Sequence, residues 1–246
     1  MRRYSTFIIL ASFFIVISAA LYFAHYLIFR DVHHIFIYMV GDLAFLPLEV
    51  FLVVIVIERI IARREKQAIM QKLNMVIGAF FSETGTSLLK SFSDFDPHRN
   101  RISKALIVTP DWSDRDFDNA CVQAKDYDYG IDIQSGNLEG LRNFLIGKRN
   151  FLLRLLENPN LLEHDAFTYL LWAIFHLTEE LTYRVDVRKL PATDMEHLAN
   201  DVKRAYGLLV SEWIDYMKHL KNSYPYLYSL AVRTNPLDPN ASPVVK

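Results

Sequence analysis

Three side chains in the second half of the chain have the residue types and spacing of a metal site. His176 is followed by Glu179 and Glu180, three and four positions later, so on a helix both carboxylates lie beside the imidazole. Helical bundles hold metal ions with such residues, using Glu and Glu-x-x-His pairs from facing helices. Here the order is His-x-x-Glu, and it occurs once. The residues that neighbouring turns can add are Glu163, His164, His197, Glu212 and His219.

The same residues also fit a surface without metal, and the sequence favours this interpretation. Glu180 and Arg184 have the i,i+4 spacing of a helical ion pair, which leaves both glutamates on a solvated face and His176 as a partly buried histidine. The chain has no Walker loop, dinucleotide fingerprint or paired CxxC motif, and no nucleophile stands beside a base. No cofactor is therefore expected.

A second set of polar residues, His25, Asp42 and Glu49, lies within apolar runs. Asp42 and Glu49 are two helical turns apart and share one face, with Pro47 between them. An ionised carboxylate in hydrocarbon costs at least about 2.5 kcal/mol, so both acids are expected to face protein or water. The favoured interpretation pairs Asp42 with His25 and bonds Glu49 to a neighbouring helix of an oligomer. The alternative is an oligomeric proton or ion conductor.

Residues 94–132 form an acidic, turn-rich section. Asp114, Asp116 and Asp118 resemble the start of a calcium loop, but positions 6 and 12 of that loop would be Asn119 and Lys125 instead of Gly and Glu. Calcium binding is therefore not expected here. Ser113 is instead predicted to start a helix, with the acids near its positive end.

Charge and cysteine content argue against nucleic-acid binding and against an internal disulfide. The formal net charge is -1, so the chain lacks the basic field of a nucleic-acid-binding domain. Nucleic acid is therefore not an expected partner. The single cysteine, Cys121, cannot form a disulfide within one chain.

Two apolar runs lie at the start of the chain, before the part that has the composition of a soluble domain. Residues 7–29 and 35–57 each match the roughly 20 apolar residues that cross a bilayer. The first run is too long for the apolar region of a signal peptide, so it is expected to be retained. The segment between them, residues 30–34, is too short for a folded element. Residues 1–57 are therefore predicted to form a transmembrane hairpin, for which the bilayer is the first partner.

Basic residues give this hairpin an orientation. Arg2 and Arg3 precede the first run, whereas the loop between the runs holds only Arg30. The second run is followed by four basic residues that we call the basic cluster: Arg59, Arg63, Arg64 and Lys66. Lys and Arg are enriched on the cytoplasmic side of membrane proteins. Both termini are therefore expected in the cytoplasm, with the hairpin in the plasma (inner) membrane.

The remaining chain shows the periodicity of helices and no sustained strand pattern. Residues 58–85 are predicted to be a juxtamembrane stalk helix that breaks near Gly85, residues 86–233 a cytoplasmic all-α domain, and residues 234–246 a Pro-rich tail. Within the domain, helices are expected over about 137–157, 161–184 and 193–221. Thr193 and Glu196 are predicted to form a capping box at the start of the third.

Three blocks of sequence carry a resemblance to a known family. GDLAFLPLEV, LNMVIGAFFSE and YPYLYSLAVRTNP are similar to segments of a family of uncharacterised prokaryotic two-span integral membrane proteins. The resemblance covers the second apolar run and both ends of the region after it. It implies a membrane location and no known activity.

The sequence thus favours an all-α, oligomeric, membrane-anchored protein without enzymatic activity. Its aromatic residues, including Trp112, Trp172 and Trp213, suit an interface. The expected function is to present the helical domain to a protein partner in the cytoplasm or membrane. The alternatives are a membrane-bound helical metalloenzyme using His176, Glu179 and Glu180, and the conductor built on Asp42 and Glu49.

Overall fold

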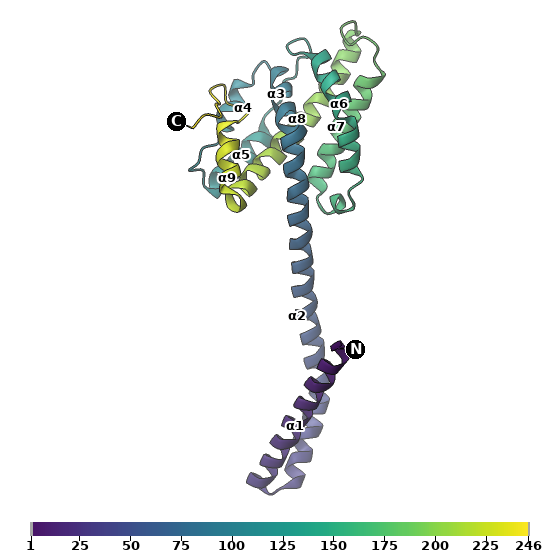
Figure 1. Ribbon diagram of the computed structural model, residues 1–246, viewed down its shortest axis with the longest axis vertical. Helices are drawn as coiled ribbons and strands as arrows, with labels where there is room; N and C mark the ends of the chain where they lie inside the picture. Colours follow the sequence, from purple (N-terminus) through teal and green to yellow (C-terminus); the bar gives the residue numbers. More distant parts are fainter. Residues whose placement is uncertain (1, 246) are drawn as a thin grey trace. The chain divides into compact units, whose positions relative to one another are not determined.

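The computed structural model describes residues 2–245, and the side chains of these residues except 2–8 and 162. Every regular element in the described part is helical, so the predicted all-α class is confirmed (Figure 1). The chain divides into two compact units, Met1–Glu65 and Lys66–Lys246. The elements are α1 (Arg2–Phe29), α2 (Val32–Phe80), the π-helical turn η1 (Phe81–Gly85), α3 (Thr86–Asp94), α4 (Asn100–Ala105), α5 (Asp114–Asp126), α6 (Leu138–Leu156), the 3-10 turn η2 (Pro159–Glu163), α7 (Asp165–Tyr183), α8 (Ala192–Ser223) and α9 (Pro225–Arg233).

In the first unit, α1 and the beginning of α2 form a helical hairpin with a very short turn (Figure 1). Arg30 adopts a left-handed conformation with φ 47°, and its amide donates to the carbonyl of Tyr26 at 2.8 Å. Asp31 Oδ1 then accepts from the amides of His33 and His34 at 2.9 and 3.3 Å. An aspartate that satisfies the first free amides of a helix acts as its N-cap. The chain therefore reverses within two residues.

The two helices of this hairpin are long and apolar enough to cross a membrane, judged by length and composition. No side chain in their most apolar windows is buried inside the structure. Glu49 and the basic cluster are likewise exposed. A helix that is apolar on all sides needs lipid or another protein chain to cover it. The apolar surface of the hairpin therefore requires a covering that the described part of this chain does not provide.

The second unit is organised around α8. This helix packs against α7, α5, α9 and α3, and α6 packs against the other side of α7. In Figure 1, α6 and α7 lie to one side of α8, whereas α5 and α9 lie to the other. Leu198, Val202, Ala205 and Leu209 are fully buried at the three- and four-residue spacing of one helix face. The core of the second unit is therefore built along one face of α8.

The end of α2 differs from the expected stalk. Leu73, Ile77 and Phe80 are buried in the second unit, and the chain stays helical from Val32 to Asp94. In place of the break predicted near Gly85 there is the π-helical turn η1. A Cβ at Gly85 would stand only 2.6 Å from Phe81 Cδ1, so the glycine permits close approach of an aromatic ring. It therefore accommodates packing without ending the helix.

Two helix starts test the predicted caps. Ser113 caps α5 as predicted: its amide donates to Asp116 Oδ2 at 2.7 Å, and the two residues form a capping box. The box predicted at Thr193 is wrong, because α8 begins at Ala192 with Pro191 as its N-cap and without a side-chain cap. The helix has already started one residue before Thr193, which removes the need for a cap at that position.

The segment expected as a Pro-rich tail begins within the fold. Asn235 is buried, and its Nδ2 donates to the carbonyl of Leu106 at 2.8 Å. Leu237 is buried as well. The start of residues 234–246 is therefore held by a buried hydrogen bond and by apolar packing. The amino-acid composition of the segment predicts neither contact.

Candidate metal centre

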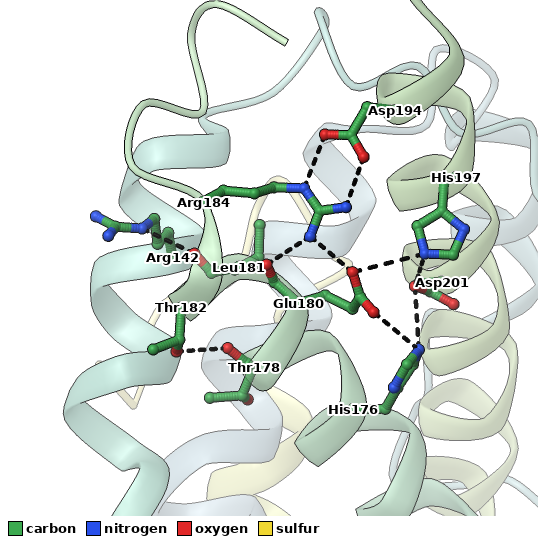
Figure 2. A network of polar contacts seen from close by, with 10 residues as sticks. All are labelled: Arg142, His176, Thr178, Glu180, Leu181, Thr182, Arg184, Asp194, His197 and Asp201. Carbon is green, nitrogen blue, oxygen red and sulfur yellow. Dashed lines mark hydrogen bonds and ion pairs between the residues drawn. The ribbon is translucent and has the colours of Figure 1, made fainter. Parts of the chain in front are cut away.

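Four ionisable side chains meet where α7 lies against α8 (Figure 2). We call them the His–carboxylate cluster: His176 and Glu180 from α7, His197 and Asp201 from α8. Asp201 Oδ2 lies 3.5 Å from Nε2 of both histidines. Glu180 Oε1 lies 3.8 Å from His176 Nε2, and Glu180 Oε2 lies 3.6 Å from His197 Nε2. Each carboxylate therefore faces both imidazoles.

The local sequence explains why these residues converge. Both helices carry the same pattern, His-Leu followed by an acid four positions after the histidine: HLTEE in α7 and HLAND in α8. Residues four apart share a helix face. The leucines after each histidine, Leu177 and Leu198, are fully buried in the core. Burial of these leucines sets the rotation of each helix, so the two His–acid faces meet at the edge of the α7–α8 contact.

Asp201 is the most unusual member of the cluster. Its side chain is only 3% exposed, and Oδ2 has no hydrogen-bond partner among the residues that the structure describes. Its other oxygen, Oδ1, forms an ion pair with Arg204 Nη2 at 3.4 Å. A buried carboxylate oxygen without a partner costs roughly 1–3 kcal/mol or more. A buried carboxylate oxygen without a hydrogen-bond partner among the described residues therefore faces both histidines.

Glu180 is held in place by an arginine. Arg184 Nη1 donates to Glu180 Oε2 at 2.7 Å, and Arg184 Nε and Nη2 donate to Asp194 at 2.8 and 2.6 Å (Figure 2). The hydrogen bond from Arg184 holds the pKa of Glu180 below its usual range, and the pKa of Asp194 is lowered for the same reason. The arginine thus joins the end of α7 to the start of α8 and keeps Glu180 ionised.

The distances between imidazole and carboxylate atoms are close to those in metal sites. Donor atoms about 2.0–2.2 Å from a central zinc ion at tetrahedral angles lie about 3.3–3.6 Å apart. In the cluster, the separations between imidazole and carboxylate atoms are 3.5, 3.5, 3.6 and 3.8 Å. Ligand atoms of His176, Glu180 and His197 also lie within 4.8 Å of one another. The 3.8 Å and 3.6 Å separations involve different oxygens of Glu180, Oε1 and Oε2. His176, Glu180 and His197 therefore form the group that could hold a metal ion, and Asp201 Oδ2 lies beside its two imidazoles.

The sequence-based candidates are divided by the structure. His176 and Glu180 belong to the cluster, and His197 joins them from the next helix. Glu179 points elsewhere and accepts from Arg149 Nε at 2.8 Å. Asp201 was not among the predicted residues, because His197 was named without the acid four positions after it. The repeated His-Leu-x-x-acid pattern is the signal that identifies it.

The other residues considered with them have separate roles. His164 Nδ1 accepts from the Phe167 amide at 3.1 Å and caps α7. His219 Nδ1 lies 3.3 Å from Asn74 Nδ2. Glu212 is buried in α8, and burial raises its pKa to about 7. Among the described contacts, none joins His164, His219 or Glu212 to the cluster.

In the hairpin, His25 and Asp42 line one cavity of about 430 Å³ together with His34. The rings of His25 and His34 are nearly parallel, with centroids 5.7 Å apart. No described contact joins Asp42 to His25, so the predicted pair is replaced by a pair of histidines beside the acid. Glu49 is exposed on α2.

Fold and cluster define a class: an all-α protein with an apolar helical hairpin and a separate helical domain. The chain belongs to the family of the uncharacterized protein MJ1433, whose N-terminal helical domain matches residues 2–61 and whose C-terminal helical domain matches residues 69–233. Uncharacterized protein MJ1433 of Methanocaldococcus jannaschii is 45% identical over 237 residues, 96% of this chain and 94% of that protein. No solved structure matches the chain significantly. The resemblance to an uncharacterised family is thereby confirmed, whereas the two-span membrane character implied by it stays a prediction.

Proposed function

We propose that this protein is a two-span membrane protein whose helical domain binds a divalent transition-metal ion at the His–carboxylate cluster. The observation that carries the proposal is Asp201: a buried carboxylate whose Oδ2 lacks a hydrogen-bond partner among the described residues and lies 3.5 Å from two imidazole nitrogens. Buried charges in proteins are paired or bind metals. A cation between these atoms satisfies the free oxygen and both nitrogens together.

The choice of metal follows from the donor atoms. Imidazole is a ligand for zinc, copper, iron and nickel, and a nearly tetrahedral set of nitrogen and oxygen donors favours zinc among them. Sites with four protein ligands are generally structural, whereas catalytic sites keep one position for water. If Asp201 is the fourth donor beside His176, Glu180 and His197, the ion ties α7 to α8 through four protein ligands. This role supports the non-enzymatic protein that the sequence favours.

The membrane part of the proposal rests on the hairpin. Its two helices expose apolar side chains all along their most apolar windows, which a bilayer would cover. The basic cluster follows the second apolar run and favours a cytoplasmic position for the domain. The helical domain would then act at the membrane surface, where we expect it to bind a protein partner, with oligomer formation through the hairpin.

The metal is tested on the full chain, purified in detergent without chelators. Elemental analysis is expected to find about one zinc or related ion per chain, and Asp201→Asn is expected to lose at least tenfold in affinity, because it removes the central ligand charge. Glu179→Gln is the control, since this acid lies on α7 next to Glu180 but contacts Arg149 instead of the cluster. It should bind metal like the wild type.

Stability provides a second readout. A ligand that binds only the folded state raises its stability, by about 2.7 kcal/mol at a free concentration of 100 times Kd. Added Zn²⁺ should therefore raise the thermal midpoint of the wild type and of Glu179→Gln but not of Asp201→Asn. Absence of both metal and a thermal shift after reconstitution of the wild type would overturn the proposal. Equal metal content in Asp201→Asn would place the ion elsewhere and overturn it as well.

A further inference from the structure

The second unit also contains an apolar cavity far along α8 from the His–carboxylate cluster. Its volume is about 570 Å³, within the roughly 300–1,000 Å³ of small-molecule sites. The end of α2, η1, the C-terminal half of α8, and α9 enclose it. Trp213, Met217 and Leu220 are buried at its wall, while Met75 and Leu230 are exposed beside them. The cavity therefore combines a packed apolar wall with an open side.

Its lining is uncharged. Of the residues that the structure describes, those lining the cavity include no Lys, Arg, Asp or Glu. Lys218 and Lys221, on the same helix, instead contact Asp118 and the Trp112 carbonyl. An ionised group entering the cavity would lose its hydration without gaining a counter-charge, which is costly. The charge pattern thus selects a neutral occupant.

One polar end of the cavity is provided by His219. Its Nδ1 accepts from Asn74 Nδ2 at 3.3 Å and lies 3.5 Å from Ser223 Oγ. Burial lowers the pKa of His219, which favours the neutral ring. A neutral imidazole that accepts at Nδ1 carries its proton on Nε2 and donates there. Among the described hydrogen bonds, none uses this Nε2.

We propose that this cavity binds a neutral, predominantly apolar small molecule that places a carbonyl or ether oxygen against Nε2 of His219. The apolar wall contributes affinity by burial, and the single donor orients the ligand. Such chemistry occurs in acyl-chain lipids and in free apolar metabolites. This site does not depend on the proposed metal, so either can be present without the other.

Binding can be followed through Trp213, which lines the cavity. The probe is a bromine-substituted methyl ester of dodecanoic acid, added to the full chain in detergent; bromine quenches nearby indoles. Saturable quenching is expected for the wild type, and Trp213→Phe, with unchanged circular dichroism, should lose this component. The corresponding ionised free acid is the charged control and should bind at least tenfold more weakly.

Two pairs of variants locate the probe. A Cβ at Gly78 would meet only the Tyr216 ring, at 3.8 Å, so Gly78→Ala fits without strain and Gly78→Leu extends into the cavity. Gly78→Leu is expected to weaken ester binding at least tenfold and Gly78→Ala less than twofold. His219→Phe should weaken binding about fivefold, the effect of one hydrogen bond, while His219→Gln retains a donor and loses less.

The natural ligand is then sought by mass spectrometry of an organic extract of the purified wild type and Gly78→Leu. A neutral lipid or metabolite enriched in the wild type supports the proposal and identifies the source. Equal ester quenching in Gly78→Leu and wild type would overturn it, as would equal binding of the ionised acid. Trp213 emission that depends on protein concentration and ignores the probe would show a second copy in the cavity and would also overturn the proposal.

Discussion

Asp201 and Glu212 are both buried acids of α8, each 3% exposed, but their surroundings give them different chemistry. Asp201 faces two histidines and Arg204, which are partners for a charged carboxylate. For Glu212, burial and then the nearby Asp215 raise the pKa to about 7. At the residue scale, therefore, the two buried acids differ: Asp201 faces side-chain nitrogens, whereas burial favours the protonated form of Glu212.

Glu212 makes a pH-dependent contribution to stability. An acid whose pKa is raised from 4.5 in the unfolded chain to about 7 in the fold destabilises the folded state progressively as pH rises between these values. Glu212→Gln, which cannot ionise, should match the wild type near pH 4.5 and exceed its stability at pH 8 by about 3 kcal/mol. Thermal midpoints at both pH values test this.

The matched control is Glu196→Gln, an exposed position on the same helix. Its difference from the wild type should be the same at both pH values. A Glu212→Gln variant with a constant difference across this range would contradict the assigned proton.

At the scale of elements, two glycines show how helical context decides their role. Gly85 ends the π-helical turn η1, and a Cβ there would stand 2.6 Å from Phe81 Cδ1 and 2.8 Å from Phe80 Cε1. Gly147 lies exposed in the interior of α6 with no atom within 4 Å of its Cβ position. The first glycine permits aromatic packing, whereas the second only adds chain entropy to the unfolded state.

Alanine at these two positions should therefore have opposite effects. Gly85→Ala is expected to destabilise the fold by about 1–3 kcal/mol through overpacking. Gly147→Ala is expected to stabilise it by about 0.5–1 kcal/mol. Since 1 kcal/mol shifts the midpoint of a 150–250-residue domain by roughly 2–4 °C, calorimetry or circular dichroism resolves both. A stabilising Gly85→Ala would contradict the close ring approach.

At the scale of the whole molecule, the apolar hairpin and the helical domain carry separate requirements. The hairpin needs a covering for its apolar surface, while the domain has a core of its own. The α1–α2 turn and the end of the chain provide two positions that report which side of a membrane each part occupies.

Cysteine labelling tests the proposed topology. In a Cys121→Ala background, His33→Cys places a thiol at the exposed α1–α2 turn, and Asn240→Cys places one at the exposed C-terminal segment. With both termini cytoplasmic, a membrane-impermeant maleimide should label His33→Cys on intact cells and Asn240→Cys only after disruption. Cys121→Ala alone controls for background. Labelling of Asn240→Cys on intact cells would reverse the orientation.

Local pattern alone determined the helical class, the short turn between the apolar helices and the helical spacing of His176 and Glu180. These properties follow from periodicity, which neighbouring residues define without reference to the rest of the fold. The cap at Ser113 was predictable for the same reason. The packing of the segment before Gly85 was not predictable, because the ring of Phe80 packs against Phe167, which is distant in the sequence.

Tertiary structure alone decided which acid accompanies His176. Glu179 and Glu180 are adjacent in sequence but point about 100° apart around a helix, since a turn holds 3.6 residues. The packing of α6 and α8 on opposite sides of α7 assigns Glu179 to Arg149 and Glu180 to His197. Asp201 joins them only because burial of Leu198 fixes the rotation of α8. Spacing defines a face within one helix, but the meeting of two faces depends on the core that holds the helices together.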